Sequence, residues 1–251
     1  MNRSSWFDVG GYSGLRVVWE DGDRVFCRGW RDGADDARNM VLVVLPAAEH
    51  PTSDSLNRLT HEYGLKDALD DAWAARPIAL TPHNDRMTLV LKDPGGAPLD
   101  RLLGKPLDVS HFLRIAIPLA EALRQVHERG LIHKDIKPAN ILVDAASGGV
   151  WLTGFGIASR LRRERQSPAP PESIAGTLAY MAPEQTGRMN RSIDARSDLY
   201  ALGVTLYQML TDSLPFTAAD PLEWVHCHIA RKPLPPSERL ENIPAPVSGL
   251  A

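Results

Sequence analysis

Cysteine is scarce in this chain, and long apolar runs are absent. The only two cysteines, Cys27 and Cys227, lie far apart, so no disulfide framework is indicated, and we interpret both as free thiols of a reducing compartment. The longest apolar run, residues 41–48, is far too short to cross a bilayer. No apolar stretch of signal-peptide type follows Met1. These absences predict a cytoplasmic protein that does not insert directly into a membrane.

An excess of charge of one sign is also missing. Lys and Arg number 28 against 31 Asp and Glu, which gives a formal net charge of −3. Proteins that bind nucleic acids usually carry a basic excess that neutralises phosphates, so we predict no nucleic-acid partner. The hydrophobic content of 43% over 251 residues is enough to bury one large core or two small ones.

The first ninety residues have the pattern of strands around a single helix. A hairpin turn signal at residues 20–23 separates the first two strand-like runs. The third run is apolar throughout, so we expect it near the centre of a sheet. The predicted strands are 15–19, 25–30, 41–45, 78–80 and 87–91. The predicted helix has Ser53 as its cap and apolar residues at helical spacing, namely Leu56, Leu59, Tyr63, Leu69 and Trp73.

Residues 93–96, Asp-Pro-Gly-Gly, end this region and predict a hinge. The pattern then becomes mainly helical. An apolar face runs from Phe112 to Val126, with Gly130 as a stop and Pro118 as the site of an expected kink. Further elements are expected at 141–143 and 150–152, a strand pair, and at 199–210, a buried helix. A strand-rich part followed by a helical part indicates an α+β fold.

The run 133–140, His-Lys-Asp-Ile-Lys-Pro-Ala-Asn, lies between the long helix and the strand pair. Phosphoryl transfer needs a carboxylate at the substrate hydroxyl, a cation at the transferred phosphate and a ligand for Mg²⁺. Three residues supply these groups at the spacing of a protein kinase catalytic loop, so the run resembles that loop. The resemblance implies Asp135 and Lys137 as catalytic residues and Asn140 as a ligand of Mg²⁺ in the ATP site. The alternative is a polar turn without chemistry.

Two later motifs follow in the order of a protein kinase. Residues 176–184, GTLAYMAPE, resemble the end of an activation segment, and Thr177 in this substrate-facing loop resembles the serine/threonine class. Residues 197–203, SDLYALG, resemble the start of the central helix. The resemblance implies that Asp198 accepts backbone hydrogen bonds from the catalytic loop. An ordinary helix cap is the other interpretation, and both can hold at once. The other structural supports implied by the resemblance are His133, Phe155 and Glu184.

Three features of an active kinase are missing. The triplet that should read Asp-Phe-Gly reads Gly-Phe-Gly at 154–156, which removes the main carboxylate ligand of Mg²⁺. The third strand contains no lysine, and Val44 stands about where the lysine is expected. The turn at 20–23 has one glycine and three acids, which repel phosphates rather than cradle them.

Several residues near these losses allow two interpretations. Glu62, which would lack its usual lysine partner, is either a solvated helix residue or the remnant of that pair. Arg28 either reaches the nucleotide or has a structural role, and Asp144 either replaces the missing carboxylate or only ends a strand. A nucleotide base could still bind through backbone groups of the hinge region, for which the expected residues are Leu91, Lys92 and Asp93. The run His226-Cys227-His228 suggests a metal site, but neighbouring helix residues point in different directions, so we interpret it as structural.

The sequences of residues 185–194, QTGRMNRSID, and 153–156, TGFG, point to one group within the protein kinases. They are similar to the N-terminal kinase-like domain of large bacterial hybrid sensor kinases. We predict one protein-kinase-like domain over residues 1–251. Its expected parts are an N-lobe at 1–92, a hinge at 93–98 and an incomplete, truncated C-lobe at 99–251.

Two functions remain open from the sequence. The resemblance implies a bilobal serine/threonine protein kinase that uses ATP and Mg²⁺ and acts on a protein substrate. The losses at Val44 and Gly154 instead favour a pseudokinase, a regulatory or interaction module with weak or no phosphoryl transfer. Whether the chain is an enzyme is therefore not decided by its sequence.

Overall fold

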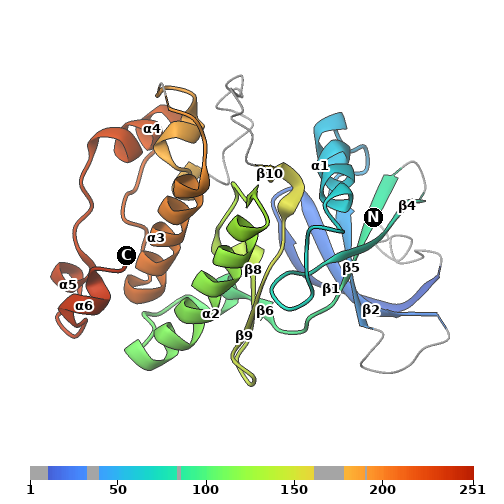
Figure 1. The fold of residues 1–251 in the computed structure, drawn as a ribbon, viewed down its shortest axis with the longest axis horizontal. Coiled ribbons are helices and arrows are strands. Elements are labelled where there is room, and N and C mark those ends of the chain that lie inside the picture. The colour runs from blue at the N-terminus through green and yellow to red at the C-terminus, as the bar shows by residue number, and fades with distance from the viewer. Residues whose placement is uncertain (1–10, 33–39, 84–85, 161–177, 190) are drawn as a thin grey trace. The chain divides into compact units, whose positions relative to one another are not determined.

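The computed structural model describes residues 11–32, 40–83, 86–160, 178–189 and 191–251 (Figure 1). The chain separates into two compact units. One contains residues 1–95 together with 153–157, and we call it the sheet unit. The other contains residues 96–152 and 158–251, and we call it the helical unit. The expected activation-segment residue Thr177 lies outside the described residues.

The sheet unit is built on five antiparallel strands in the order β1-β2-β3-β5-β4. The apolar third strand is central, as its composition predicted. Gly22 turns the hairpin between the first two strands with a φ of +58°, a conformation that favours glycine. The strands are β1 (Tyr12–Asp21), β2 (Arg24–Arg31), β3 (Met40–Pro46), β4 (Pro77–His83) and β5 (Arg86–Lys92).

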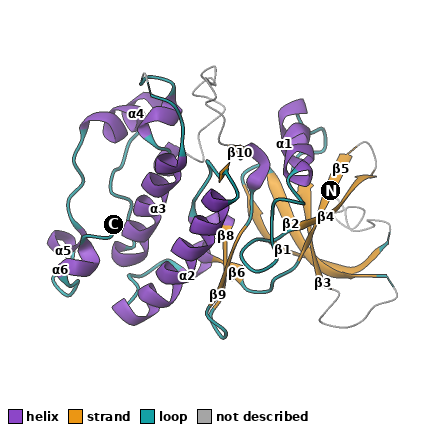
Figure 2. Cartoon of the chain, in the orientation of Figure 1, coloured by secondary structure: helices purple, strands orange, loops and turns teal. Residues whose placement is uncertain are grey.

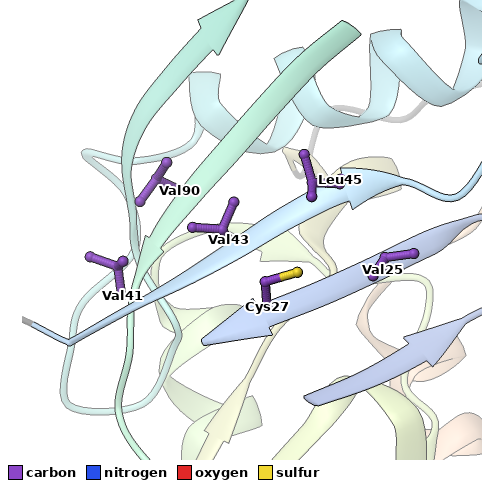
Figure 3. Close-up of a cluster of buried hydrophobic side chains, with 6 residues drawn as sticks. All are labelled: Val25, Cys27, Val41, Val43, Leu45 and Val90. Atoms are coloured by element: carbon purple, nitrogen blue, oxygen red, sulfur yellow. The ribbon is translucent and has the colours of Figure 1, made fainter. Parts of the chain in front are cut away.

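Both faces of the central strand are buried. One face carries a cluster of small apolar side chains from three neighbouring strands (Figure 3), which are Val25, Cys27, Val41, Val43, Leu45 and Val90. Side chains alternate between faces along a strand, so Phe26 and its register partner Val44 point the other way. Both are buried, and the ring of Trp19 stacks on Phe26 at 4.4 Å between centroids. A strand that is apolar on both faces is therefore explained by burial on both sides.

Helix α1 (Ser53–Gly64) contacts β4 and β5 (Figure 1). Its cap is Thr52, whose hydroxyl accepts the backbone N–H of Ser55 at 3.2 Å, so the expectation of Ser53 as cap was wrong. The helix also ends earlier than predicted. Trp73 is not in it, because consecutive hydrogen-bonded turns after Leu65 keep the spacing of buried side chains without continuing the helix.

The helical unit contains the two longest of the described helices and, among its described residues, only short strands (Figure 2). Helix α2 runs unbroken through Pro118 and contacts α3. Asp108 caps α2 and Asp194 caps α3, each through backbone N–H groups of the first turn. The α-helices are α2 (Val109–Glu128), α3 (Ala195–Thr211), α4 (Pro221–Ala230), α5 (Pro236–Arg239) and α6 (Ala245–Ser248).

Short strands and 3-10 turns join these helices. The strands form a three-stranded sheet, β6-β8-β9, and a pair, β10-β7. They are β6 (Ala97–Pro98), β7 (Leu131–Ile132), β8 (Ile141–Asp144), β9 (Gly149–Leu152) and β10 (Ser159–Arg160). The 3-10 turns are η3 (Leu99–Leu102), η4 (Pro138–Asn140), η7 (Leu178–Tyr180) and η8 (Pro183–Thr186), with η5 (Phe155–Ile157) in the sheet unit.

The helix predicted at 199–210 is present within α3, but Leu199 at its start is 53% exposed rather than buried. Cys27 and Cys227 are both free and buried. Among the described residues, no helix is both long enough and apolar enough to span a membrane.

Candidate functional site

The run 133–140 forms a loop of the helical unit between β7 and β8. Asp198, fully buried on α3, accepts the backbone N–H of His133 at 2.8 Å and that of Lys134 at 2.7 Å. Its Oδ2 atom also lies 2.9 Å from Nε2 of His127 on α2. The hydrogen bonds expected of Asp198 are therefore present, and they hold the loop to α3 through a charged acceptor, the stronger kind of hydrogen bond.

Two polar residues of the loop lie at the carboxylate of Asp135. Asn140 donates its side-chain amide to Asp135, at 2.7 Å to Oδ2 and 2.8 Å to the backbone oxygen. Nζ of Lys137 lies 3.6 Å from the same Oδ2. The other oxygen, Oδ1 of Asp135, is buried and has no hydrogen-bond partner among the described residues. A buried acceptor without a partner is costly, which is typical of a functional site.

The segment after Thr177 is held to the same unit at several points. Gln185 donates its side-chain amide to the backbone oxygen of Lys134 at 2.9 Å. Glu184 accepts the hydroxyl of Ser197 at 2.5 Å. Lys134 has a φ of +69°, an uncommon backbone conformation for a residue other than glycine. The contact from Gln185 therefore braces the loop where its backbone is strained.

Glu62 on α1 differs most from the prediction made from the sequence. It is only 2% exposed, so the interpretation as a solvated helix residue was wrong. Its Oε1 accepts the backbone N–H of Gly154 at 3.2 Å. Burial raises the pKa of Glu62, whereas Arg24 and the backbone N–H groups of Phe155 and Gly154 act in the opposite direction. Within the sheet unit, this carboxylate is therefore bound to the backbone of the Gly-Phe-Gly triplet.

The arginines of β2 take up separate positions. Arg28 pairs with Asp93, its Nε lying 2.5 Å from Oδ2 of that nearly buried carboxylate, which is the structural role left open by the sequence. Arg24 pairs with Asp21 at 2.6 Å, and its guanidinium lies 5.3 Å from the centroid of the Phe26 ring. Sequence reasoning missed Arg24. The one signal for it was its position two residues before Phe26, on the strand face that also carries Val44.

Two of the three residues expected to bind a nucleotide base, Lys92 and Asp93, already use their backbone N–H groups. The N–H of Lys92 is donated to Arg76 O at 2.8 Å, and that of Asp93 to Met40 O at 3.3 Å. Pro94 has no N–H, and the N–H of Gly95 is donated to the carboxylate of Asp93 at 2.9 Å. Residues 92–95 therefore offer no free backbone donor to an adenine ring.

The residues present do not fit a magnesium ion of the usual kinase kind. Mg²⁺ prefers carboxylate oxygens in octahedral geometry. Gly154 has no side-chain oxygen, and the carboxylate of Asp144 accepts hydrogen bonds from Ala146 and Ser147 in the β8–β9 turn. Over the described part of the chain, no three His, Cys, Asp or Glu side chains come together in a way that could hold a metal ion.

The position of loop 133–140 and of its anchor Asp198 agrees with the family to which the sequence is similar. Residues 44–242 match the protein kinase domain, and the chain belongs to that family. Its fold is the α+β fold of that family, with an antiparallel N-terminal sheet and a helical part.

Bacterial serine/threonine kinases are among the similar proteins. A probable serine/threonine-protein kinase of Corynebacterium efficiens, CE0033, is 38% identical over 55% of this chain and 20% of its own length. PknB of Mycobacterium tuberculosis is 36% identical over 56% of this chain and 22% of its own length. Pkn1 of Myxococcus xanthus is 35% identical over 75% of this chain and 26% of its own length. The matches span only about a fifth to a quarter of these relatives.

Proposed function

We propose that the chain is a serine/threonine kinase-like signalling domain in which phosphoryl transfer is weak. Family membership and the loop built around Asp135 support the kinase-like class. Its free oxygen, Oδ1, is suited to accept the proton of a substrate hydroxyl, and Lys137 brings a positive charge to the same place.

The alternative is a pseudokinase that regulates or binds another protein. The observation that supports weak or absent phosphoryl transfer is the hydrogen bond that the backbone N–H of Gly154 donates to Glu62. In the kinase pattern, the helix glutamate pairs with a strand lysine that grips the nucleotide phosphates. Here Val44 stands at the lysine position, and Glu62 instead stabilises a triplet that has lost its metal ligand.

The location, bounds and partners of the domain are part of the same proposal. We infer a cytoplasmic kinase-like domain covering residues 1–251, with parts at 1–92, 93–98 and 99–251, that acts on or binds a protein. Nucleic acid and direct membrane insertion play no part in it. The wording of residues 185–194 supports a place in a bacterial hybrid sensor kinase. Glu184, His133 and Phe155 would support the domain structurally, and Thr177 would lie in the segment that faces the protein partner.

Nucleotide binding and transfer can be measured on the same purified chain. Calorimetry with ATP, in the presence and absence of Mg²⁺, should show weak binding that the metal barely changes. Transfer of γ-³²P to the chain itself or to dephosphorylated casein should stay close to that of Asp135→Asn. Removing a single electrostatic contact of the transition state typically lowers the rate by about 10²–10³, and here two charged groups are absent.

Gly154→Asp is the matched gain-of-function variant. Gly154 has a φ of +82°, which aspartate tolerates at a modest cost, so the variant tests whether one carboxylate restores metal-dependent binding. Tight Mg²⁺-dependent ATP binding by the natural chain, with transfer abolished in Asp135→Asn, would contradict the proposal of weak or absent transfer.

A further inference from the structure

His228 on α4 connects this helix to the segment that follows Thr177. The side chain is only 6% exposed, although its neighbour His226 is exposed. Its Nε2 atom lies 2.7 Å from the backbone oxygen of Leu178, the first described residue after Thr177. Its Nδ1 atom lies 2.7 Å from the hydroxyl of Tyr200 on α3. One imidazole therefore joins two helices and η7 within the helical unit.

These contacts determine which ring nitrogen carries the proton. A carbonyl oxygen can only accept, so Nε2 must donate to Leu178. In the neutral ring, Nδ1 then accepts from the hydroxyl of Tyr200. Burial, followed by the charges of Glu184 and Cys227, raises the pKa of Tyr200 to about 12, so this hydroxyl keeps its proton. Burial lowers the pKa of His228, which favours the neutral ring.

Aromatic rings hold the imidazole in this orientation. Trp224 stacks on it with 5.8 Å between centroids and an interplanar angle of 20°. Phe216 and Tyr200 meet it edge-on at 5.7 and 5.6 Å. A ring enclosed in this way cannot rotate freely, so its hydrogen bond fixes the position of the Leu178 carbonyl.

The rest of the segment is fastened by different groups. Tyr180 donates its hydroxyl to Gln208 on α3 at 2.6 Å, and Gln185 donates its side-chain amide to the backbone oxygen of Lys134 in loop 133–140. The bond from His228 is the contact nearest to Thr177 among the side-chain bonds of the described part of this segment. It therefore fixes the backbone at the first residue of the described segment, Leu178.

We propose that His228 is a positioning residue that fixes the segment 178–185 for binding of a protein substrate or partner. The proposal rests on the proposed function only in taking this segment as the surface that faces the partner. It adds a specific device, a neutral histidine of α4 acting through the Leu178 carbonyl.

Two isosteric substitutions separate the two hydrogen bonds of the ring. The side-chain amide of His228→Gln places an N–H near the position of Nε2 and can still reach Leu178. The shorter side chain of His228→Asn places its polar atoms near Nδ1, toward Tyr200, and cannot reach. Hydrogen exchange of peptides covering residues 178–186, read by mass spectrometry, reports directly on the segment. His226→Asn, on the exposed side of the same helix, is the matched control.

The expected result is local. The Asn variant should speed exchange in 178–186 about tenfold, as expected for losing one buried hydrogen bond, whereas the Gln variant and the control stay near the natural chain. Tyr200→Phe provides a second test, because it removes the hydrogen bond from the Tyr200 hydroxyl to Nδ1 of His228 and should leave the bond to Leu178 in place. Unchanged exchange in the Asn variant, equal loss in Gln and Asn, or faster exchange throughout the helical unit would overturn the proposal.

The measurement needs no nucleotide and no phosphoryl transfer. Its outcome is therefore independent of whether the chain is an active kinase or a pseudokinase. Faster exchange in the Asn variant without transfer or partner binding in any variant would count against the proposed function and leave the role of His228 intact.

Discussion

Glu62 shows how a buried carboxylate is held by backbone groups. A carboxylate removed from water needs hydrogen bonds or a counter-charge, otherwise it takes up a proton. Here the backbone N–H of Gly154 and the nearby charge of Arg24 act on it, and burial still raises its pKa. The residue is therefore retained as a backbone anchor, and its ionisation works against stability.

Replacing Glu62 by Gln tests this balance. Because the pKa of Glu62 is raised in the folded chain, the folded state binds more protons than the unfolded state above pH 4.5, and the free energy of unfolding falls as the pH rises. Gln keeps an acceptor oxygen for Gly154 and does not titrate. The difference in unfolding free energy, Glu62→Gln minus the natural chain, should therefore grow between pH 4.5 and 7.5 in urea titrations.

Glu62→Ala provides the comparison. It leaves the N–H of Gly154 without its acceptor and should cost about 1–3 kcal/mol. A pH-independent difference between Glu62→Gln and the natural chain would show that the folded and unfolded states bind the proton of Glu62 equally well.

At the scale of elements, the strands were easier to predict than the ends of the helices. An apolar run such as 41–45 is informative because both faces of β3 are buried. The end of α1 was missed because the turns after Gly64 bury Leu65, Leu69 and Trp73 at nearly helical spacing. The sequence pattern reports which side chains are buried, and it does not distinguish one continuous helix from a helix followed by turns.

The candidate site likewise contains residues that the sequence predicted and residues that it did not. The loop 133–140 and its anchor Asp198 were predictable because their residue types and spacing are specific. The burial of Glu62 was not, since a glutamate on an amphipathic helix is usually solvated. The contacts of His228 depend on tertiary packing between α3, α4 and η7, and no local pattern reports them.

The cap of α1 gives a prediction at this scale. Thr52 and Ser53 are adjacent, exposed hydroxyl residues, and only Thr52 accepts an N–H of the first turn. Thr52→Ala should lower the free energy of unfolding by about 0.5–2 kcal/mol, whereas Ser53→Ala should have little effect. Urea denaturation of both variants measures the two free energies of unfolding and shows which residue caps the helix. A larger loss in Ser53→Ala would mean that the helix begins one residue later than the structure shows.

For the whole molecule, the stability of the folded chain should respond to mild acid through His228. Its pKa is lowered by burial, so the unfolded state, with an ordinary histidine pKa near 6.5, binds the proton more tightly. The stabilising contribution is complete above about pH 6.5 and is lost as the pH falls through the lower, folded pKa. The groups that face the ring, Tyr200 from α3 and the Leu178 carbonyl from η7, do not titrate in that range, because the pKa of Tyr200 is about 12.

A pH series of urea denaturation isolates this contribution by subtraction. The difference in unfolding free energy between the natural chain and His228→Gln should shrink steadily from pH 7.5 to pH 5. Gln does not titrate, whereas His228 binds a proton more tightly in the unfolded state, so acid destabilises only the natural chain at this position. His226→Gln, which removes an exposed histidine from the same helix, is the matched control. If acid instead widened the gap between the natural chain and His228→Gln, the folded state would be the one that holds the proton. The imidazole would then be charged, and its bond to Leu178 would require a cation rather than a neutral ring.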